Sequence, residues 1–378
     1  RLDKKILKQD EKLEELEEIL RKGFQYPIVK LGDILQLSDN EKVGSHDIPI
    51  LSVTMRNGLV DQSEKFGKRI ASDDISGYKL VRKNQLVVGF PIDEGVLSFQ
   101  QKHDIAAVSP AYDIWKINEE TSVNINFVEY VLRSNKAREI YKSKMIGAAG
   151  RRRSIPKDIF IDIQIPLPPL EVQNEIEEKI QKQKKIIEGA ARIEEGWKPE
   201  YSKDNCELKK LGDVIELQRG YDLPKYEFKE GNIPVMGSNG IIGYHDIYKH
   251  EAPGVITGRS GTIGKVQYIE KPYWPHNTSL FVKDFKGNEP KFIYYLLQGI
   301  DLKGLSDNTT AVPSLDRKNA YLLDVFLPSS ETQRQIVEKL DRQMQALEGV
   351  RLLKCEAQKR IEEILTGIWG ENTDHSHS

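Results

Sequence analysis

Three consecutive arginines follow a run of small residues in a segment that could bind a polyanion. Met145–Gly150 is rich in glycine and alanine, and Arg151–Arg153 comes directly after it. A guanidinium donates two parallel hydrogen bonds to a phosphate or to the edge of a guanine, and small residues let the backbone enter a groove. The pattern favours a nucleic-acid surface, although a solvated basic loop would have the same sequence. The candidate DNA-binding residues of this segment are Lys142, Lys144, Gly150, Arg151, Arg152 and Arg153.

Further candidate contacts lie in short polar segments nearer the C-terminus. Ser306–Thr310 carries short hydrogen-bonding side chains and a single charge, on Asp307. Tyr273–Asn277 combines aromatic and polar side chains, although aromatic residues there are equally expected in a core. A glycine-rich segment contributes one more arginine. The candidates from these segments are Arg259, Tyr273, His276, Asn277, Ser306, Asn308, Thr309 and Thr310.

The motifs that would indicate catalysis are incomplete. Gly258–Lys265 resembles a phosphate-binding loop, but its spacing is wrong by one residue and no Ser or Thr follows the lysine, so a glycine hairpin is the better interpretation. The methyltransferase motif of Asn or Asp, two prolines and an aromatic residue is absent, as is a Gly-x-Gly cluster for a methyl-donor cofactor. His245 and His250 are five residues apart, which misses one face of a helix. We therefore predict no catalytic residue, no metal site and no cofactor.

The composition limits the class of protein. The chain has 378 residues, which suggests two or three domains, and its 56 basic and 58 acidic side chains give a net charge of −2. This charge excludes a globally basic nucleic-acid binder but leaves room for a local basic face. Cys206 and Cys355 are too few for a disulfide framework. No apolar run approaches the ~18 residues of a spanning helix. We expect a cytoplasmic protein that does not enter a membrane.

The chain repeats its own sequence once, with the segments in the same order. The repeated patterns are a Leu-Gly-Asp opening, a Phe-x-x-Tyr-x-Leu segment and a Leu-Pro-x-x-Glu-x-Gln segment that leads into a helix. The spacing between the copies shrinks along the chain, as expected for similar units that differ by deletions. The pairs are 31–34 with 211–214, 127–132 with 292–297, and 167–173 with 327–333.

Long helices are predicted where apolar residues recur at intervals of three, four and seven. These stretches are 3–22, 169–196 and 329–369, and Gly196–Pro199 is expected to end the second one. Between the helices, short apolar runs alternate with Gly, Pro, Asn and Asp, which is typical of strands and turns. The Phe-x-x-Tyr-x-Leu segments predict a short buried helix in each block. Each block is therefore expected to be α+β, with a curved and irregular sheet.

These repeated motifs resemble the specificity (S) subunit of type I restriction-modification enzymes. The resemblance covers nearly all of residues 25–369, and the duplicated Leu-Pro-x-x-Glu-x-Gln pattern is its most specific part. The N-terminal helix departs from the commonest layout of the family. The resemblance implies two similar target-recognition domains, related by a pseudo-twofold repeat and separated by long antiparallel coiled-coil-like helices. It also implies that these helices serve as a spacer and bind methyltransferase (modification) subunits.

The family layout assigns a role to each segment of this chain. Each recognition domain is expected to read one half of an asymmetric bipartite target in double-stranded DNA. Restriction or translocase subunits would join through the assembled complex. The expected segments are an N-terminal helix (1–24), recognition domain 1 (25–168), spacer helix 1 (169–199), recognition domain 2 (200–328), spacer helix 2 (329–369) and a tail (370–378).

Two other classes of function remain open on the sequence. One is an enzyme, either a stand-alone DNA endonuclease or a fused restriction-modification polypeptide. The missing methyltransferase motifs count against it, whereas carboxylates scattered along the chain could still form a nuclease site. The other is a coiled-coil scaffold whose domains bind protein. The arginine loop argues mildly against that alternative.

Overall fold

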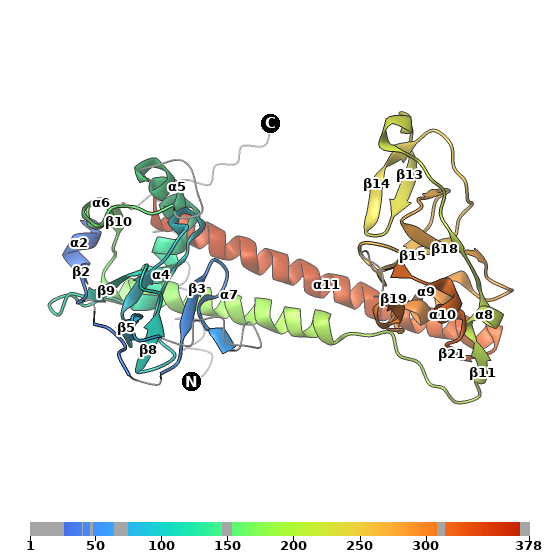
Figure 1. Ribbon diagram of the computed structural model, residues 1–378, viewed down its shortest axis with the longest axis horizontal. Helices are drawn as coiled ribbons and strands as arrows, with labels where there is room; N and C mark the ends of the chain where they lie inside the picture. Colours follow the sequence, from blue (N-terminus) through green and yellow to red (C-terminus); the bar gives the residue numbers. More distant parts are fainter. Residues whose placement is uncertain are drawn as a thin grey trace, which may run out of the picture. The chain divides into compact units, whose positions relative to one another are not determined.

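The computed structural model describes residues 26–39, 41–45, 48–63, 75–145, 153–307 and 314–370. The chain divides into two compact units: unit 1 comprises residues 1–189 and 353–378, and unit 2 comprises residues 190–352. The helix predicted at 3–22 and residues 371–378 of the predicted tail lie outside the described residues. In Figure 1, unit 1 contains the blue and green elements and unit 2 the yellow and orange ones.

Unit 1 is built from short strands and short helices that precede one long helix. Among its described residues the longest strand has five residues, which suits a sheet interrupted by turns. The elements in chain order are β1 (Ile28–Lys30), α2 (Leu31–Ile34), β2 (Leu35–Leu37), β3 (Leu51–Thr54), β4 (Gly58–Asp61), β5 (Lys79–Arg82), β6 (Leu86–Val88), η1 (Ile92–Glu94), β7 (Leu97–Phe99), β8 (Ile105–Val108), β9 (Asp113–Ile117), α4 (Ile125–Arg133), α5 (Asn135–Lys144), α6 (Lys157–Ile161), β10 (Gln164–Pro166) and α7 (Leu170–Gly196).

Unit 2 follows the same plan and leads into the longest helix of the described chain. The last residues of α7 belong to this unit, and the last residues of its own long helix belong to unit 1. The elements are β11 (Glu207–Lys210), α8 (Leu211–Val214), β12 (Glu216–Arg219), η2 (Lys225–Glu227), β13 (Ile233–Gly237), β14 (Gly240–His245), β15 (Gly254–Gly258), β16 (Val266–Ile269), β17 (Trp274–Pro275), β18 (Ser279–Asp284), α9 (Pro290–Gln298), η3 (Lys303–Leu305), β19 (Ser306–Asp307), β20 (Ser314–Leu315), α10 (Arg317–Tyr321), β21 (Asp324–Leu327) and α11 (Ser330–Ile368).

The sheets of the two units have matching topologies. Each unit pairs its first strand with its last one, as β1 with β10 and as β11 with β21. Each also has a four-stranded sheet, in the order β2-β9-β6-β7 in unit 1 and β12-β18-β15-β16 in unit 2. Neighbouring strands in both four-stranded sheets are antiparallel. The structure therefore confirms both the duplication and the α+β class.

The repeated Leu-Gly-Asp segment forms the same short helix in both units. The Leu31 N–H donates to Ile163 O (2.8 Å), and the Leu211 N–H donates to Leu323 O (2.9 Å). Both leucine side chains are fully buried. A Cβ at Gly212 would lie 3.0 Å from the Cβ of Tyr321, so the glycine allows helix α10 to pack closely against α8. Burial and close packing thus explain why this short motif recurs.

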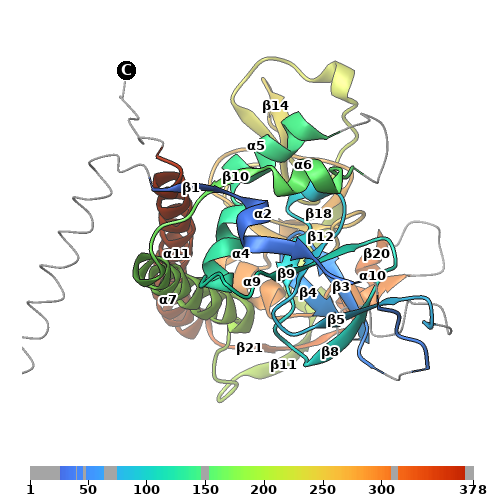
Figure 2. The ribbon, with the colours of Figure 1, turned by 90° about the vertical axis from the view of Figure 1, so that its left-hand side faces the viewer.

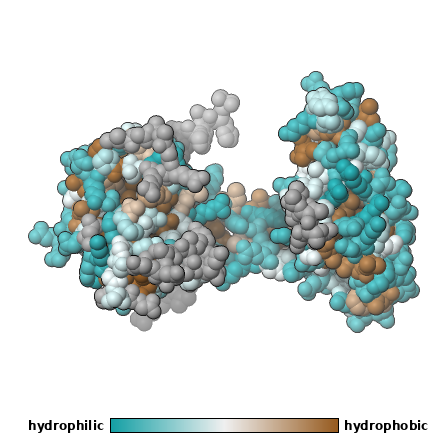
Figure 3. All heavy atoms as spheres, in the orientation of Figure 1, coloured by the Kyte–Doolittle hydropathy of each residue, from teal (hydrophilic) through white to brown (hydrophobic). Residues whose placement is uncertain are grey.

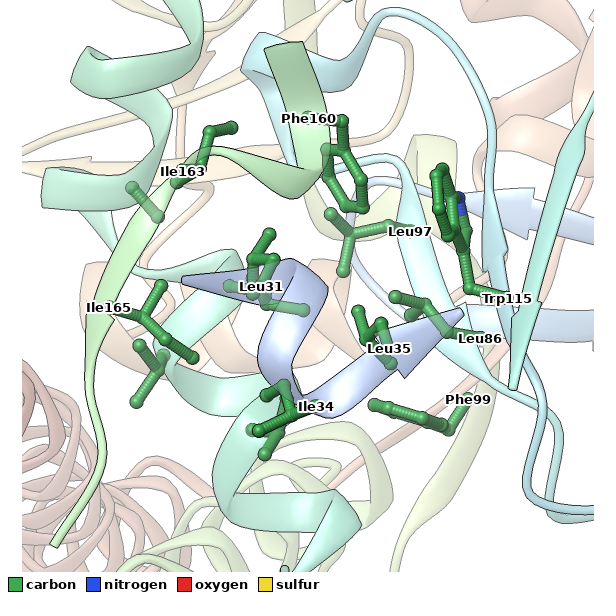
Figure 4. Close-up of a cluster of buried hydrophobic side chains, with 14 of the residues drawn as sticks. Leu31, Ile34, Leu35, Leu86, Leu97, Phe99, Trp115, Phe160, Ile163 and Ile165 are labelled. Atoms are coloured by element: carbon green, nitrogen blue, oxygen red, sulfur yellow. The ribbon is translucent and has the colours of Figure 1, made fainter. Parts of the chain in front are cut away.

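The core of unit 1 lies between the sheet and the helices. Leu31, Leu86, Leu97 and Trp115 come from different elements and point toward one another in Figure 4. The Phe-x-x-Tyr-x-Leu segment supplies α4, whose buried side chains include Phe127. Unit 2 has an equivalent core into which α9 buries its own apolar face. The prediction of a short buried helix in each block is confirmed.

The long helices begin where the Leu-Pro motifs predict. Helix α7 starts at Leu170, shortly after β10, and ends at Gly196. Helix α11 starts at Ser330, shortly after β21. In unit 1 the first part of α7 and the last part of α11 lie side by side, as Figures 1 and 2 show. Ile176 of α7 and Ile368 of α11 join the same hydrophobic core.

A buried glutamine attaches each long helix to its unit. The Gln173 carboxamide accepts a hydrogen bond from the Asn124 N–H (2.9 Å) at the start of α4 and donates to Pro168 O (2.7 Å). Gln333 accepts from the Glu289 N–H (2.9 Å) at the start of α9 and makes the equivalent donation to the Pro328 carbonyl (3.0 Å). The Gln of the repeated motif therefore fixes the short helix against the long one.

Candidate functional site

Several candidate residues of unit 2 gather at one end of its four-stranded sheet. Arg259 follows the last residue of β15, and Asn277 lies two residues before β18. These two ends meet because Gly258 pairs with Ser279 across the antiparallel strands. The Leu315 N–H donates to Arg259 O (2.8 Å), so β20 lies at the same place. The sheet thus assembles one polar surface from segments far apart in sequence.

The glycine-rich segment after β15 is a hairpin, as the sequence predicts. Strand β16 follows it and pairs antiparallel with β15, whereas a nucleotide-binding loop would open a helix. Gly261 and Gly264 have positive φ angles of 78° and 82°, which glycine adopts without strain. Among the described residues, no carboxylate forms an ion pair with the guanidinium of the preceding Arg259. That guanidinium remains available for an anion.

Polar side chains next to this hairpin already bind one another. The Asn277 carboxamide donates to Asp222 Oδ1, and the same oxygen lies 3.4 Å from Arg219 Nη2. His276 Nδ1 lies 3.1 Å from Thr278 Oγ1. All of these residues are at least partly exposed. These contacts hold the polar side chains in place beside the hairpin while leaving them partly accessible to solvent.

Tyr273 does not belong to this surface, so its prediction as a DNA contact is wrong. Its side chain is fully buried and packs with Phe281 in an apolar cluster. Burial raises the pKa of its hydroxyl well above the ordinary range. A Cβ at Gly254 would lie 2.3 Å from its ring, so the strand fits the tyrosine closely. The alternative that the sequence left open, an aromatic core residue, is the correct one.

The corresponding end of the sheet in unit 1 carries Arg153. Its Nη1 lies 3.1 Å from Asp93 Oδ2, and it forms a second ion pair with Glu94. The Ile92 N–H donates to Arg153 O (3.2 Å). Asp93 is buried, so the arginine neutralises a carboxylate that would otherwise be costly in the interior. Arg153 therefore holds the end of the arginine loop against η1.

The remaining loop candidates are only partly described. Lys142 and Lys144 are exposed in the last turn of α5, directly before the arginine loop. Ser306 belongs to β19, and only its backbone is described. The other candidates lie outside the described residues, and their DNA-binding role stays a prediction. They are Gly150, Arg151, Arg152, Asn308, Thr309 and Thr310.

The comparisons with known proteins agree with this arrangement. Residues 203–366 match the family model of the type I restriction modification DNA specificity domain. This match places a type I restriction modification DNA specificity domain in the second half of the chain. Its fold is similar to that of the type I restriction-modification S subunit from M. genitalium, with 15% identity, a TM-score of 0.51, and 92% of this chain and 97% of that one covered. No curated protein matches the sequence.

A second solved structure has a similar fold over a similar length. It comes from work described as the structural basis of complex assembly and conformational transition of the type I R-M system. The identity is 14% and the TM-score 0.57, and the match covers 91% of this chain and 99% of the other. The matched domain is a DNA specificity domain, and the first similar structure is that of an S subunit. The prediction of a non-catalytic subunit is thus confirmed, and the enzyme alternative is set aside.

Within the specificity domain of unit 2, the sequence did not reveal an exposed apolar face. Hydrophobic surface gathers over β14 in Figure 3. Ile241 is 53% exposed and Ile242 43% exposed, and both lie on β14 where its register with β13 shifts. A strand with glycines beside isoleucines gives no alternating pattern from which this exposure could be predicted.

Two classes of site are not formed by the described residues. In that part of the chain, no three His, Cys, Asp or Glu side chains come together as a possible metal site. No described helix is both long and apolar enough to cross a membrane.

Proposed function

We propose that each repeat reads one half of an asymmetric, bipartite target in double-stranded DNA. The recognition domains in this proposal are residues 25–168 and 200–328. The long helices, at 169–199 and 329–369, bind methyltransferase subunits and set the spacing of the two half-sites. Restriction or translocase subunits join the same assembly, and the protein works in the cytoplasm.

The observation that carries this proposal is that the two units share one sheet architecture but present different side chains at the same end of it. Both units bring loops to the same end of a matching four-stranded sheet. In unit 1 that end carries Arg153, which is paired with Asp93 and Glu94, whereas in unit 2 it carries the Arg259 hairpin and the amide of Asn277. Because base edges are read by the side chains of such loops, two different surfaces favour two different half-sites.

Exposed apolar side chains on the long helices support a protein-binding role. In unit 2, Ile193 of α7 is 54% exposed and Leu352 of α11 is 63% exposed. Arg351 Nε lies 3.2 Å from Glu194 Oε1, so these helix segments are neighbours and their exposed residues can form one surface. Burying such side chains against a partner contributes about 1.5–3 kcal/mol each. This favours helical partners for the long helices.

The length of α7 is compatible with a spacer role. Its 27 residues extend about 40 Å at 1.5 Å per residue. One turn of DNA is about 34 Å, so a helix of this size matches the separation of successive major grooves. A chain with two readers and such a helix would leave a stretch of unread base pairs between the half-sites.

The direct test is methylome sequencing of cells that carry the methyltransferase subunits, with and without this chain. A bipartite methylated motif that appears only with the chain is the expected result. A methyltransferase that is active on other DNA but gives no chain-dependent motif would contradict the proposal. In that case the protein-binding scaffold becomes the better interpretation.

A further inference from the structure

The hairpin between β3 and β4 in unit 1 presents three side chains that no functional assignment has used. Its tip is Met55, Arg56 and Asn57, and all three are exposed. Met55 keeps 42% of its surface exposed, which is high for a methionine. The strands below it, by contrast, bury Leu51 and Leu59 in an apolar cluster. The tip therefore projects from a rigid base.

Hydrogen bonds within the turn fix its backbone. Thr54 Oγ1 donates to Gly58 O (3.0 Å) and accepts from the Asn57 N–H (3.0 Å). Gly58 has a φ of +62°, and a Cβ there would lie 2.6 Å from Ser98 Oγ. Glycine is thus required both by the turn and by its close approach to β7.

An arginine from α4 also holds the tip. Arg133 Nη2 donates to Met55 O (2.6 Å) and to Arg56 O (3.2 Å). The same guanidinium lies 3.2 Å from Glu129 Oε1. Glu129 in turn accepts from the Phe99 N–H (2.8 Å) on β7. A helix and a neighbouring strand therefore pre-organise a turn whose own side chains face solvent.

The side chains that this clamp presents have the chemistry of base recognition. Among the described residues, neither the Arg56 guanidinium nor the Asn57 carboxamide has a hydrogen-bond or ion-pair partner. Arginine makes two hydrogen bonds to guanine O6 and N7, and asparagine makes two to adenine N6 and N7. A two-stranded ribbon is narrow enough to enter the major groove of B-DNA. Fixing the backbone lowers the conformational entropy that such contacts would lose on binding.

The second repeat has a hairpin at the same place in its topology. It joins β13 to β14, and its tip again ends in Asn-Gly, at Asn239 and Gly240. Here the asparagine is occupied, because Lys265 Nζ donates to its backbone oxygen (2.7 Å) and to Oδ1 (3.0 Å). The repeats thus share the hairpin but differ in the side chains that it leaves free.

We propose that the Met55–Asn57 tip reads bases for the first recognition domain, with Arg56 on a guanine and Asn57 on an adenine in the major groove. This inference rests on the proposed function and names a reading element for one of its half-sites. Met55 covers the adjoining apolar surface of the groove, such as a thymine methyl group. Arg133 is a positioning residue, since it acts through the backbone of the tip.

The test compares variants of the full chain assembled with its methyltransferase subunits. The variants are R56A, R56K and N57A, and K83A is the matched control that removes an exposed charge elsewhere in unit 1. Methylome sequencing reports the motif, and competition binding with short duplexes reports affinity. R56A and N57A are each expected to weaken binding to the intact target roughly tenfold and to relax one position of a single half-site.

R56K separates base reading from simple charge attraction. Lysine keeps the charge but lacks the fork of two donors, so relaxed preference for guanine in R56K supports the proposal. A uniform loss of affinity with an unchanged motif would identify a phosphate contact and overturn it. So would variants whose motif and affinity equal those of the wild type. Those outcomes leave the proposed function intact, whereas a wild-type chain that directs no motif contradicts both.

Discussion

Individual residues of the candidate surface have different tasks, and Arg153 is the clearest case. Sequence alone groups it with Arg151 and Arg152 as candidate DNA-binding residues for phosphate or a guanine edge. The structure pairs it with the buried Asp93 and with Glu94, at the edge of the sheet. A guanidinium held in this way fixes residue 153 against η1. Adjacent arginines can thus contribute separately to stability and to binding.

We expect Arg153→Ala to lower the free energy of unfolding by about 2 kcal/mol, because it leaves a buried carboxylate without its partner. The joint change of Arg151 and Arg152 to Ala should instead weaken DNA binding by the assembled complex without affecting stability. Urea titration and duplex binding separate these effects.

The matched control for the Arg153 prediction is Asp93→Asn. In the Arg153→Ala background it removes the unpaired charge and should restore part of the lost stability. No rescue would indicate that the arginine stabilises the unit through packing alone. Unchanged DNA affinity after replacement of Arg151 and Arg152 would remove the arginine loop from the DNA surface.

At the level of elements, the helices that could be predicted from the sequence are mostly those that contain the repeated motifs. The helix starts at 170 and 330 and the short helices α4 and α9 follow from Pro, Gln and apolar spacing, because each has a local or repeated cause. The irregular strands are harder to predict, since they are two to six residues long and their partners are distant in sequence. Tyr273 illustrates the same limit, because burial depends on long-range packing.

The motif glutamine joins these elements, and its removal should be costly. Gln333→Leu removes the acceptor of the Glu289 N–H and the donor to Pro328 O, and it leaves these groups buried near an apolar side chain. We expect a loss of about 2–3 kcal/mol in the free energy of unfolding. The exposed Gln343→Leu on the same helix is the control and should change stability by less than about 0.5 kcal/mol. Equal urea midpoints for the two variants would contradict this role.

The exposed apolar residues of the long helices give a prediction about assembly. Ile193→Asp together with Leu352→Asp should abolish association with methyltransferase subunits, because both side chains would bring a charge into an apolar interface. The isolated chain should keep its stability, since both positions are exposed. Co-purification followed by size-exclusion chromatography measures the effect.

A control for the assembly prediction is Glu171→Lys, an exposed charge change in the first turn of α7. It alters charge without touching the apolar residues and should leave association nearly unchanged. A doubly substituted chain that still assembles normally would argue against a partner at this surface.

At the scale of the whole molecule, the proposed function assigns DNA specificity to the parts that differ between the two repeats and assembly to the parts that they share. Both units have a four-stranded sheet of matching order, whereas the described side chains at the ends of these sheets differ, and under the proposed function the shared parts serve assembly. Replacing residues 200–328 by the equivalent domain of another specificity chain should therefore change one half of the methylated motif. The other half and the ability to assemble should stay constant, because the donor domain keeps the Leu-Pro and Gln contacts with α11. Methylome sequencing reads both halves in one experiment. A change in both halves would mean that the units read DNA jointly, and the division of the target between the repeats would have to be abandoned.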